Sequence, residues 1–101
     1  MSTRYEDLFR SLRNRGEGAF VPFLMLGDPT PEHTLAIVRT VVAAGADALE
    51  LGVPFSDPVA DGPTIQASHL RALDGGATVD SALEQVRAIR AEFPELPIGM
   101  L

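Results

Sequence analysis

Apolar residues recur along the chain at two different spacings, and the alternation between them predicts the order of helices and strands. Near the N-terminus, four apolar positions follow the i, i+3, i+4, i+7 spacing of an amphipathic helix, which we place at residues 4–14: Tyr5, Leu8, Phe9 and Leu12. Thr3 and Glu6 have the spacing of a capping box at its start. Gly16 and Gly18 are expected to end it.

Three short apolar runs have the length and composition of strands. Residues 19–26 are rich in Val, Phe and Leu, although Pro22 removes one ladder donor and predicts a bulge or a strand end. Residues 47–53 form the second predicted strand. The third predicted strand begins at Leu96 and runs to Leu101.

Helical patterns fill the spaces between these strands. Pro31 suits the first position of a helix whose apolar stripe stops at Gly45 and comprises Leu35, Val38, Val41 and Val42. Residues 65–73 predict a short helix. Thr78 is expected to cap another helix, which stops at Pro94. The stripe of this second helix comprises Leu83, Val86, Ile89, Arg90 and Phe93. Strands that alternate with helices indicate βαβ units and a parallel sheet. The pattern alone allows either a doubly wound sheet or a (β/α)₈ barrel.

Composition narrows the possible function classes. The 101 residues are 46% hydrophobic and carry a net charge of -6, which is typical of a soluble globular chain and unlike a surface that binds nucleic acid or anionic membrane. The chain has no Cys, so disulfides, thiolate chemistry and Cys-ligated metals are excluded. Because no signal core and no run of about 18 apolar residues is present, we expect a cytoplasmic protein.

Candidate chemistry centres on an acidic residue inside an apolar strand. Alternation places Leu49, Leu51 and Val53 on one face and Glu50 on the other, between the small residues Ala48 and Gly52. A carboxylate in a packed interior normally has a partner, a raised pKa or a cavity that holds ligand and water. The small neighbours favour the cavity, and the alternative is a structural ion pair.

The loop after this strand adds a second carboxylate. Pro54 and Pro58 stiffen the loop, and Asp57 and Asp61 place acidic groups on it, so that Glu50 and Asp61 could face one ligand. The alternative is that Ser56 or Asp57 caps a turn and that Asp61 with Gly62 is ordinary turn chemistry. His33 and His69 lack metal-like spacing and are expected to be surface or capping residues, so no metal is predicted.

Three segments resemble one known family. The segment Glu50-Leu-Gly-Val-Pro-Phe-Ser-Asp-Pro-Val-Ala-Asp61-Gly-Pro-Thr-Ile-Gln66 resembles the signature of the tryptophan synthase alpha chain family, as do Phe20-Val-Pro-Phe-Leu-Met-Leu-Gly-Asp-Pro29 and Ala43-Ala-Gly-Ala-Asp-Ala-Leu-Glu50. Met25-Leu26 departs from the family, in which many members have Thr before Leu. The resemblance implies a (β/α)₈ TIM barrel with an extra N-terminal helix. A barrel needs about 250 residues, so residues 1–101 are expected to be the N-terminal fragment of a single barrel domain.

The resemblance also implies an activity and its residues. The family cleaves indole-3-glycerol phosphate by a retro-aldol step, with Glu50 matching the acid-base group and Asp61 the carboxylate near the indole nitrogen. Phe23, Ile65 and Leu101 match apolar walls of the substrate pocket. Asp57 and Pro58 match contacts with the beta chain of an alpha-beta-beta-alpha complex, and pyridoxal phosphate is expected in that partner, with no cofactor in this chain.

Two alternatives remain beside this lyase interpretation. The substrate phosphate is expected at loops after strands seven and eight, which lie outside these residues, so the chain alone is expected to be inactive. A non-catalytic barrel fragment competent only for partner binding or complementation is therefore the main alternative. A different phosphate-handling barrel enzyme is the second, and the length of the match from Glu50 to Gln66 argues against it.

Overall fold

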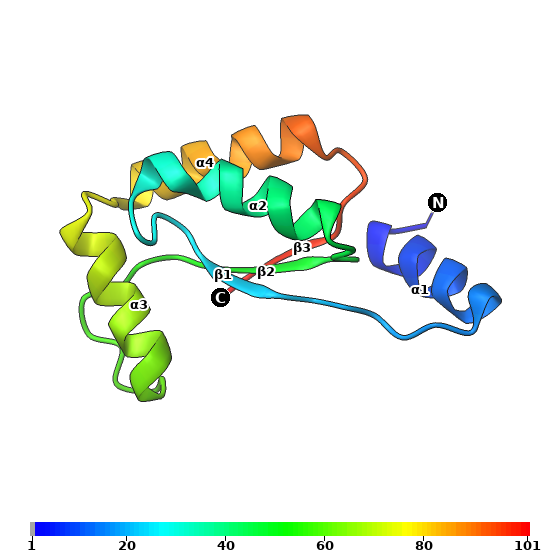
Figure 1. Cartoon of the computed structure of the whole chain (residues 1–101), viewed down its shortest axis with the longest axis horizontal. Helices are drawn as coiled ribbons and strands as arrows, with labels where there is room; N and C mark the ends of the chain where they lie inside the picture. The colour runs from blue at the N-terminus through cyan, green and yellow to red at the C-terminus, as the bar shows by residue number, and fades with distance from the viewer. Residues whose placement is uncertain (1) are drawn as a thin grey trace.

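The computed structural model describes residues 2–101 and contains one three-stranded sheet with α-helices at its face and ends (Figure 1). The predicted order of helices and strands is confirmed. In chain order the elements are α1 (Arg4–Arg15), β1 (Phe23–Met25), the 3₁₀ turn η1 (Pro31–His33), α2 (Thr34–Ala43), β2 (Leu49–Gly52), α3 (Pro63–Asp74), α4 (Val79–Glu92) and β3 (Ile98–Met100).

The sheet is parallel, with β2 between β1 and β3. All three strands are shorter than predicted, and β1 most of all. Pro22 has no N–H, so the regular ladder starts only at Phe23, although the Pro22 carbonyl still accepts from the Glu50 N–H at 3.0 Å. Upstream, the Asp47 N–H donates to the Phe20 carbonyl at 2.8 Å, so the chain stays alongside β2 without forming a strand.

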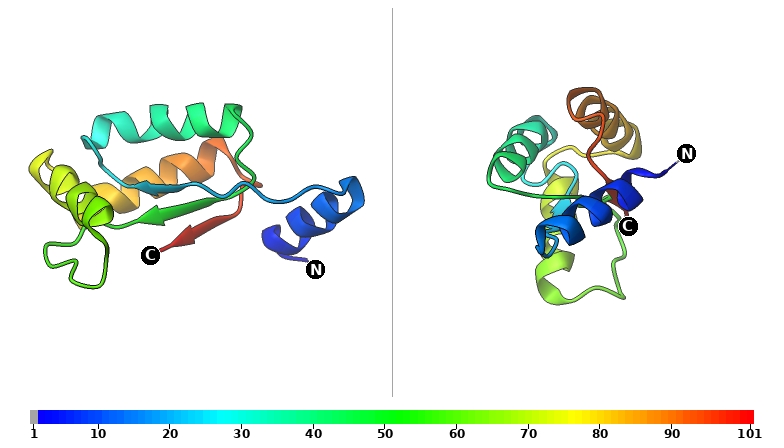
Figure 2. Two further views of the ribbon diagram at one scale, coloured as in Figure 1. Left: turned by 60° about the horizontal axis from the view of Figure 1, so that its bottom comes forward. Right: turned by 90° about the vertical axis from the view of Figure 1, so that its right-hand side faces the viewer.

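Helices α2 and α4 cover one face of the sheet, as the two orientations of Figure 2 make plain. The core beneath them contains five fully buried large side chains, Leu26, Val38, Leu49, Leu51 and Ile89. Each such burial contributes about 1.5–3 kcal/mol relative to exposure. The predicted stripe of α4 was wrong at Leu83, which is 55% exposed, because Ala82 faces the sheet in its place.

The opposite face of the sheet is not covered by a helix of residues 2–101 (Figure 2). The helix α3 instead lies beyond the carboxyl ends of the strands (Figure 1). Ala72 of α3 packs with Met25 of β1 and with Ala77. Gly27, at φ +89°, permits this packing, since a Cβ there would lie 2.7 Å from the Ala77 Cβ. Helix α3 therefore borders the carboxyl end of β1.

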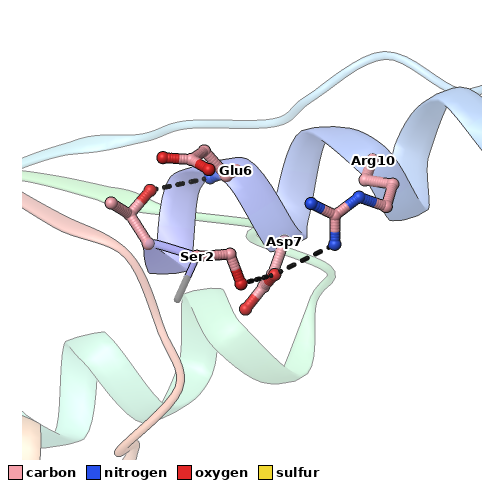
Figure 3. Close-up of polar contacts among 5 residues, drawn as sticks. Ser2, Glu6, Asp7 and Arg10 are labelled. Atoms are coloured by element: carbon pink, nitrogen blue, oxygen red, sulfur yellow. Dashed lines mark hydrogen bonds and ion pairs between the residues drawn. The ribbon is translucent and has the colours of Figure 1, made fainter.

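The helix α1 lies beyond the amino ends of the strands (Figure 1). Thr3 caps it by accepting from the Glu6 N–H at 3.0 Å, and Asp7 accepts from Ser2 at 2.6 Å and from Arg10 at 3.3 Å (Figure 3). Of its predicted stripe, only Leu12 is buried within the described residues, while Tyr5 and Phe9 are 38% and 46% exposed. The apolar stripe of α1 is thus left partly uncovered.

Candidate functional site

A cavity of about 600 Å³ opens at the carboxyl ends of β1 and β2. Its volume falls in the range of small-molecule sites, and apolar side chains form most of its wall. The lining residues are Phe23, Gly52, Val53, Pro54, Phe55, Asp61, Ile65, His69, Val79 and Leu101. Four residues singled out in the sequence, from β1, the β2–α3 loop, α3 and the end of the chain, therefore converge on one space: Phe23, Asp61, Ile65 and Leu101.

Glu50 lies on the uncovered face of the sheet, outside the lining of this cavity. It is paired in register with Phe23 on one side and with Gly99 on the other. A Cβ on Gly99 would lie 2.5 Å from the Glu50 Oε1, so the missing side chain gives the carboxylate its room. Gly52, which lines the cavity, is two residues further along the same face, about 7 Å away by strand geometry.

No ion pair or hydrogen bond engages the Glu50 carboxylate within residues 2–101. The structural ion pair considered from the sequence is therefore not formed by the described residues. The two small neighbours of Glu50 have different surroundings. Ala48 is completely buried. Gly52 makes room for Phe23, because a Cβ there would lie 2.7 Å from the Phe23 Cζ. The prediction of a cavity beside small residues fits Gly52 and not Ala48.

Asp61 is paired with His69. The His69 Nε2 lies 3.0 Å from the Asp61 Oδ2, and the Phe55 N–H donates to the His69 Nδ1 at 2.9 Å. The expectation that His69 is a surface or capping residue was wrong, because its side chain is only 9% exposed while that of Asp61 is 41% exposed. His69 follows Ile65 by four positions on α3, so helical spacing could have placed it on the cavity side.

The loop between β2 and α3 is organised as turns. The Asp61 N–H donates to the Pro58 carbonyl at 3.3 Å, and the Gln66 side chain donates to the Asp61 carbonyl at 2.7 Å. Turn chemistry at Asp61 is therefore present together with its place in the cavity. Asp57 is exposed, and within the described residues its side chain caps no turn; only its carbonyl accepts, from Val59 at 2.9 Å.

A second polar cluster beside the cavity was not anticipated from the sequence. Asp28, in the loop after β1, accepts from Arg71 at 3.0 and 2.9 Å and from Ser68 at 2.7 Å. The hydrogen bonds from Arg71, with a smaller contribution from Ser68, hold the pKa of the Asp28 carboxyl below its usual value. The sequence identified Gly27-Asp28-Pro29 only as a turn, and the cluster ties that turn to α3.

Across residues 2–101, three or more His, Cys, Asp or Glu side chains nowhere gather closely enough to hold a metal ion. In the same stretch, none of the helices has the length and apolar character required to span a bilayer.

Comparison with known protein families gives a consistent match. The model of the family described as tryptophan synthase alpha chain matches residues 9–101. The tryptophan synthase alpha chain of Corynebacterium diphtheriae is 80% identical over 99 residues, covering 98% of this chain and 36% of that protein. The corresponding protein of Corynebacterium aurimucosum is 78% identical with the same coverage. The chain thus spans little more than a third of the length of these curated relatives.

Solved structures agree with the sequence matches. The crystal structure of tryptophan synthase subunit alpha from Legionella pneumophila superposes with a TM-score of 0.92 at 37% identity, covering 99% of this chain and 38% of that one. The aminoacrylate-bound tryptophan synthase from Mycobacterium tuberculosis superposes with a TM-score of 0.87 at 33% identity, covering 98% of this chain and 40% of that one. The predicted fold class is confirmed as part of a (β/α)₈ TIM barrel. On the family model and these relatives together, the chain belongs to the tryptophan synthase alpha chain family.

Proposed function

We propose that the full-length protein containing these residues is a lyase that cleaves indole-3-glycerol phosphate to indole and glyceraldehyde 3-phosphate. One observation carries the proposal: Asp61 and three apolar side chains line a single cavity, and Glu50 projects from the sheet face that leads into it. In barrel enzymes the active site lies at the carboxyl ends of the strands, which is where this cavity opens. Residues 1–101 would form the N-terminal part of one barrel domain.

The retro-aldol step requires two proton transfers and one charge to be stabilised. A proton is delivered to indole C3, the bond from C3 to the glycerol carbon breaks, and a proton leaves the adjacent glycerol hydroxyl as it becomes the aldehyde. A carboxyl group can act in both transfers, and we assign them to Glu50. A positive charge develops at the indole nitrogen, and a fixed carboxylate nearby stabilises it electrostatically. We assign this role to Asp61.

The apolar wall positions are assigned to the indole ring. Phe23 lies over Gly52, and it lines the cavity together with Ile65 and Leu101. A planar apolar ring is favoured in such a space because its burial removes apolar area from water. The phosphate is expected to bind outside residues 1–101, so the isolated chain should release no indole.

We also propose that the exposed part of the β2–α3 loop contacts a tryptophan synthase beta chain. Asp57 is exposed and Pro58 is half-buried, and both belong to the loop that carries Asp61. A loop shared by the cavity and an interface can couple the two sites. Pyridoxal phosphate would be held by the beta chain, and a cytoplasmic location would suit this biosynthetic role.

The test of this function is indole release by the full-length protein, compared among matched carboxylate variants. Glu50→Gln should abolish release, and Asp61→Asn should reduce it by about 100-fold or more, the usual scale for losing an electrostatic stabiliser. Glu84→Gln removes a carboxylate that is 67% exposed on α4 and should leave release unchanged. Wild-type release from a folded Glu50→Gln protein would refute the assignment.

A second candidate function for residues 1–101 is complementation. In the described residues one sheet face has no helix and both β1 and β3 are sheet edges, and the exposed apolar side chains include Phe20, Val21 and Leu101. Unpaired parallel edges favour association with further strands. Mixing this chain with the rest of the barrel should restore indole release, and no recovery from two folded pieces would argue against it.

A further inference from the structure

We propose that His69 is the positioning residue of Asp61, and that it fixes one carboxylate oxygen while leaving the other for the substrate. The inference rests on the function proposed above. The Asp61 Oδ2 has the His69 Nε2 at 3.0 Å, whereas no side chain among residues 2–101 donates to the Asp61 Oδ1. A carboxylate held at one oxygen retains full acceptor capacity at the other.

The backbone determines which tautomer of His69 fits. The Phe55 N–H donates to the His69 Nδ1 at 2.9 Å, so that nitrogen must carry a lone pair and not a proton. In the neutral ring the proton then lies on Nε2, which is the nitrogen that faces Asp61. The imidazole is therefore a donor toward Asp61 because it is an acceptor toward Phe55.

These two hydrogen bonds join the two ends of one loop. Phe55 lies shortly after β2 and Asp61 shortly before α3, and both are held by the same ring. The ring itself is only 9% exposed and belongs to a helix whose neighbouring residues Ser68 and Ala72 are also buried. A buried side chain on a packed helix has few accessible rotamers, so it sets the direction of the exposed carboxylate.

A neutral donor suits the charge that Asp61 is proposed to carry. An Arg or Lys partner would offset the negative charge of the carboxylate, whereas a neutral imidazole orients it and leaves that charge in place. Stabilisation of a cationic indole nitrogen depends on that remaining charge and on a fixed geometry. His69 would thus act through Asp61 without touching the substrate's reacting atoms.

The experiment uses the full-length protein with two substitutions at the buried position. His69→Phe keeps an aromatic ring and removes both ring nitrogens, and it should lower kcat for indole release about 10- to 100-fold, the scale of a misplaced catalytic group. His69→Gln supplies an N–H donor to Asp61 without the ring acceptor, and it should recover most of kcat. A general packing defect would instead leave both variants impaired.

A double-mutant cycle separates positioning from stability. If His69 acts through Asp61, His69→Phe should have little further effect once Asp61→Asn is present, so the two losses are not additive. Additive losses, or an unchanged kcat in folded His69→Phe, would overturn the inference while the role of Asp61 stands. Full activity in Asp61→Asn alone would instead remove the proposed role of Asp61 and this inference with it.

Nuclear magnetic resonance provides a readout that needs no turnover. The nitrogen shifts of His69 should show a protonated Nε2 and an unprotonated Nδ1, and the Nε2 proton resonance should move in Asp61→Asn. The opposite tautomer, or a resonance indifferent to Asp61→Asn, would contradict the proposal.

Discussion

The two faces of the sheet differ in the residues that they carry and in how deeply those residues are buried. On the helix-covered face, Leu49 and Leu51 are fully buried with Ile89 of α4. On the uncovered face, one register row contains Phe23, Glu50 and Gly99, an aromatic ring, a carboxylate and a residue without a side chain. Because successive strand residues point to opposite faces, the four residues of β2 serve packing on one side and the proposed chemistry on the other.

The largest expected effect separates stability from activity at adjacent positions of β2. In the full-length protein, Leu51→Ala should lower the free energy of unfolding by about 2–5 kcal/mol, because it removes buried methyl groups and leaves a cavity. Glu50→Gln should change it by less than about 1 kcal/mol, since the carboxylate has no partner within the described residues. Urea denaturation followed by circular dichroism checks both values, and equal losses would erase the distinction between the faces.

Much of this arrangement could be predicted from the sequence, because burial imposes a period on apolar residues. The element order follows from the helical and strand spacings of the apolar residues, and the two faces of β2 follow from alternation. The start of β1 could not be predicted in this way, since Pro22 lacks an N–H yet its carbonyl still accepts from the Glu50 N–H. The choice of barrel over doubly wound sheet needed the family resemblance, because both architectures share the βαβ pattern.

The candidate site was less predictable than the fold. Glu50 stood out because carboxylates are unusual in apolar strands, and Asp61 because it follows that strand on a loop stiffened by two prolines. His69 did not stand out, since one His on a helix is commonly exposed, and its role depends on the loop folding back so that the Phe55 N–H reaches it. Likewise, nothing local distinguished Asp28 from a turn residue; Arg71 is 43 positions away in sequence.

The space left by Gly99 offers a sharper test of the uncovered face. Gly99→Ala would place a Cβ 2.5 Å from the Glu50 Oε1 and 2.8 Å from Oε2, so the carboxylate must move. Only the end of a flexible side chain has to shift, so we expect little loss of stability. Because the displaced carboxylate is the proposed acid-base group, we expect kcat for indole release to fall about 10-fold or more. Steady-state kinetics on the full-length protein measures this.

Gly18→Ala is the matched control, since a Cβ there meets no atom within 4 Å. It should leave kcat unchanged. If both variants behave alike, Glu50 does not require the room that Gly99 provides, and the uncovered face tolerates ordinary side chains in that row.

The hydrogen bonds that tie Asp28 to α3 should depend on pH, whereas the packing of the apolar core should not. Hydrogen bonds from Arg71 and Ser68 lower the pKa of Asp28, so its stabilising contribution is present above the unfolded pKa of about 3.9 and is lost as pH falls through the folded value. Asp28→Asn should cost about 1 kcal/mol near neutral pH, a value reduced because Arg71 is 56% exposed.

Unfolding at a series of pH values tests this dependence. The difference in the free energy of unfolding between the wild type and Asp28→Asn should shrink below about pH 4. A difference independent of pH would mean that Asp28 stabilises α3 by shape and not by charge. Leu51→Ala serves as the reference, because its effect should not vary in the same interval.

The smallest effect is expected for an ion pair on the covered side. Arg39 of α2 donates to Glu92 of α4 through two hydrogen bonds of 2.7 Å, and these lower the pKa of Glu92. Arg39 is 55% exposed, however, and an exposed pair contributes little because water and salt screen it. Glu92→Gln should therefore reduce stability less than Asp28→Asn in the same denaturation experiment, and added salt should narrow its effect further. A larger loss than Leu51→Ala would show that charge, and not the buried leucines, attaches α2 and α4 to each other over the sheet.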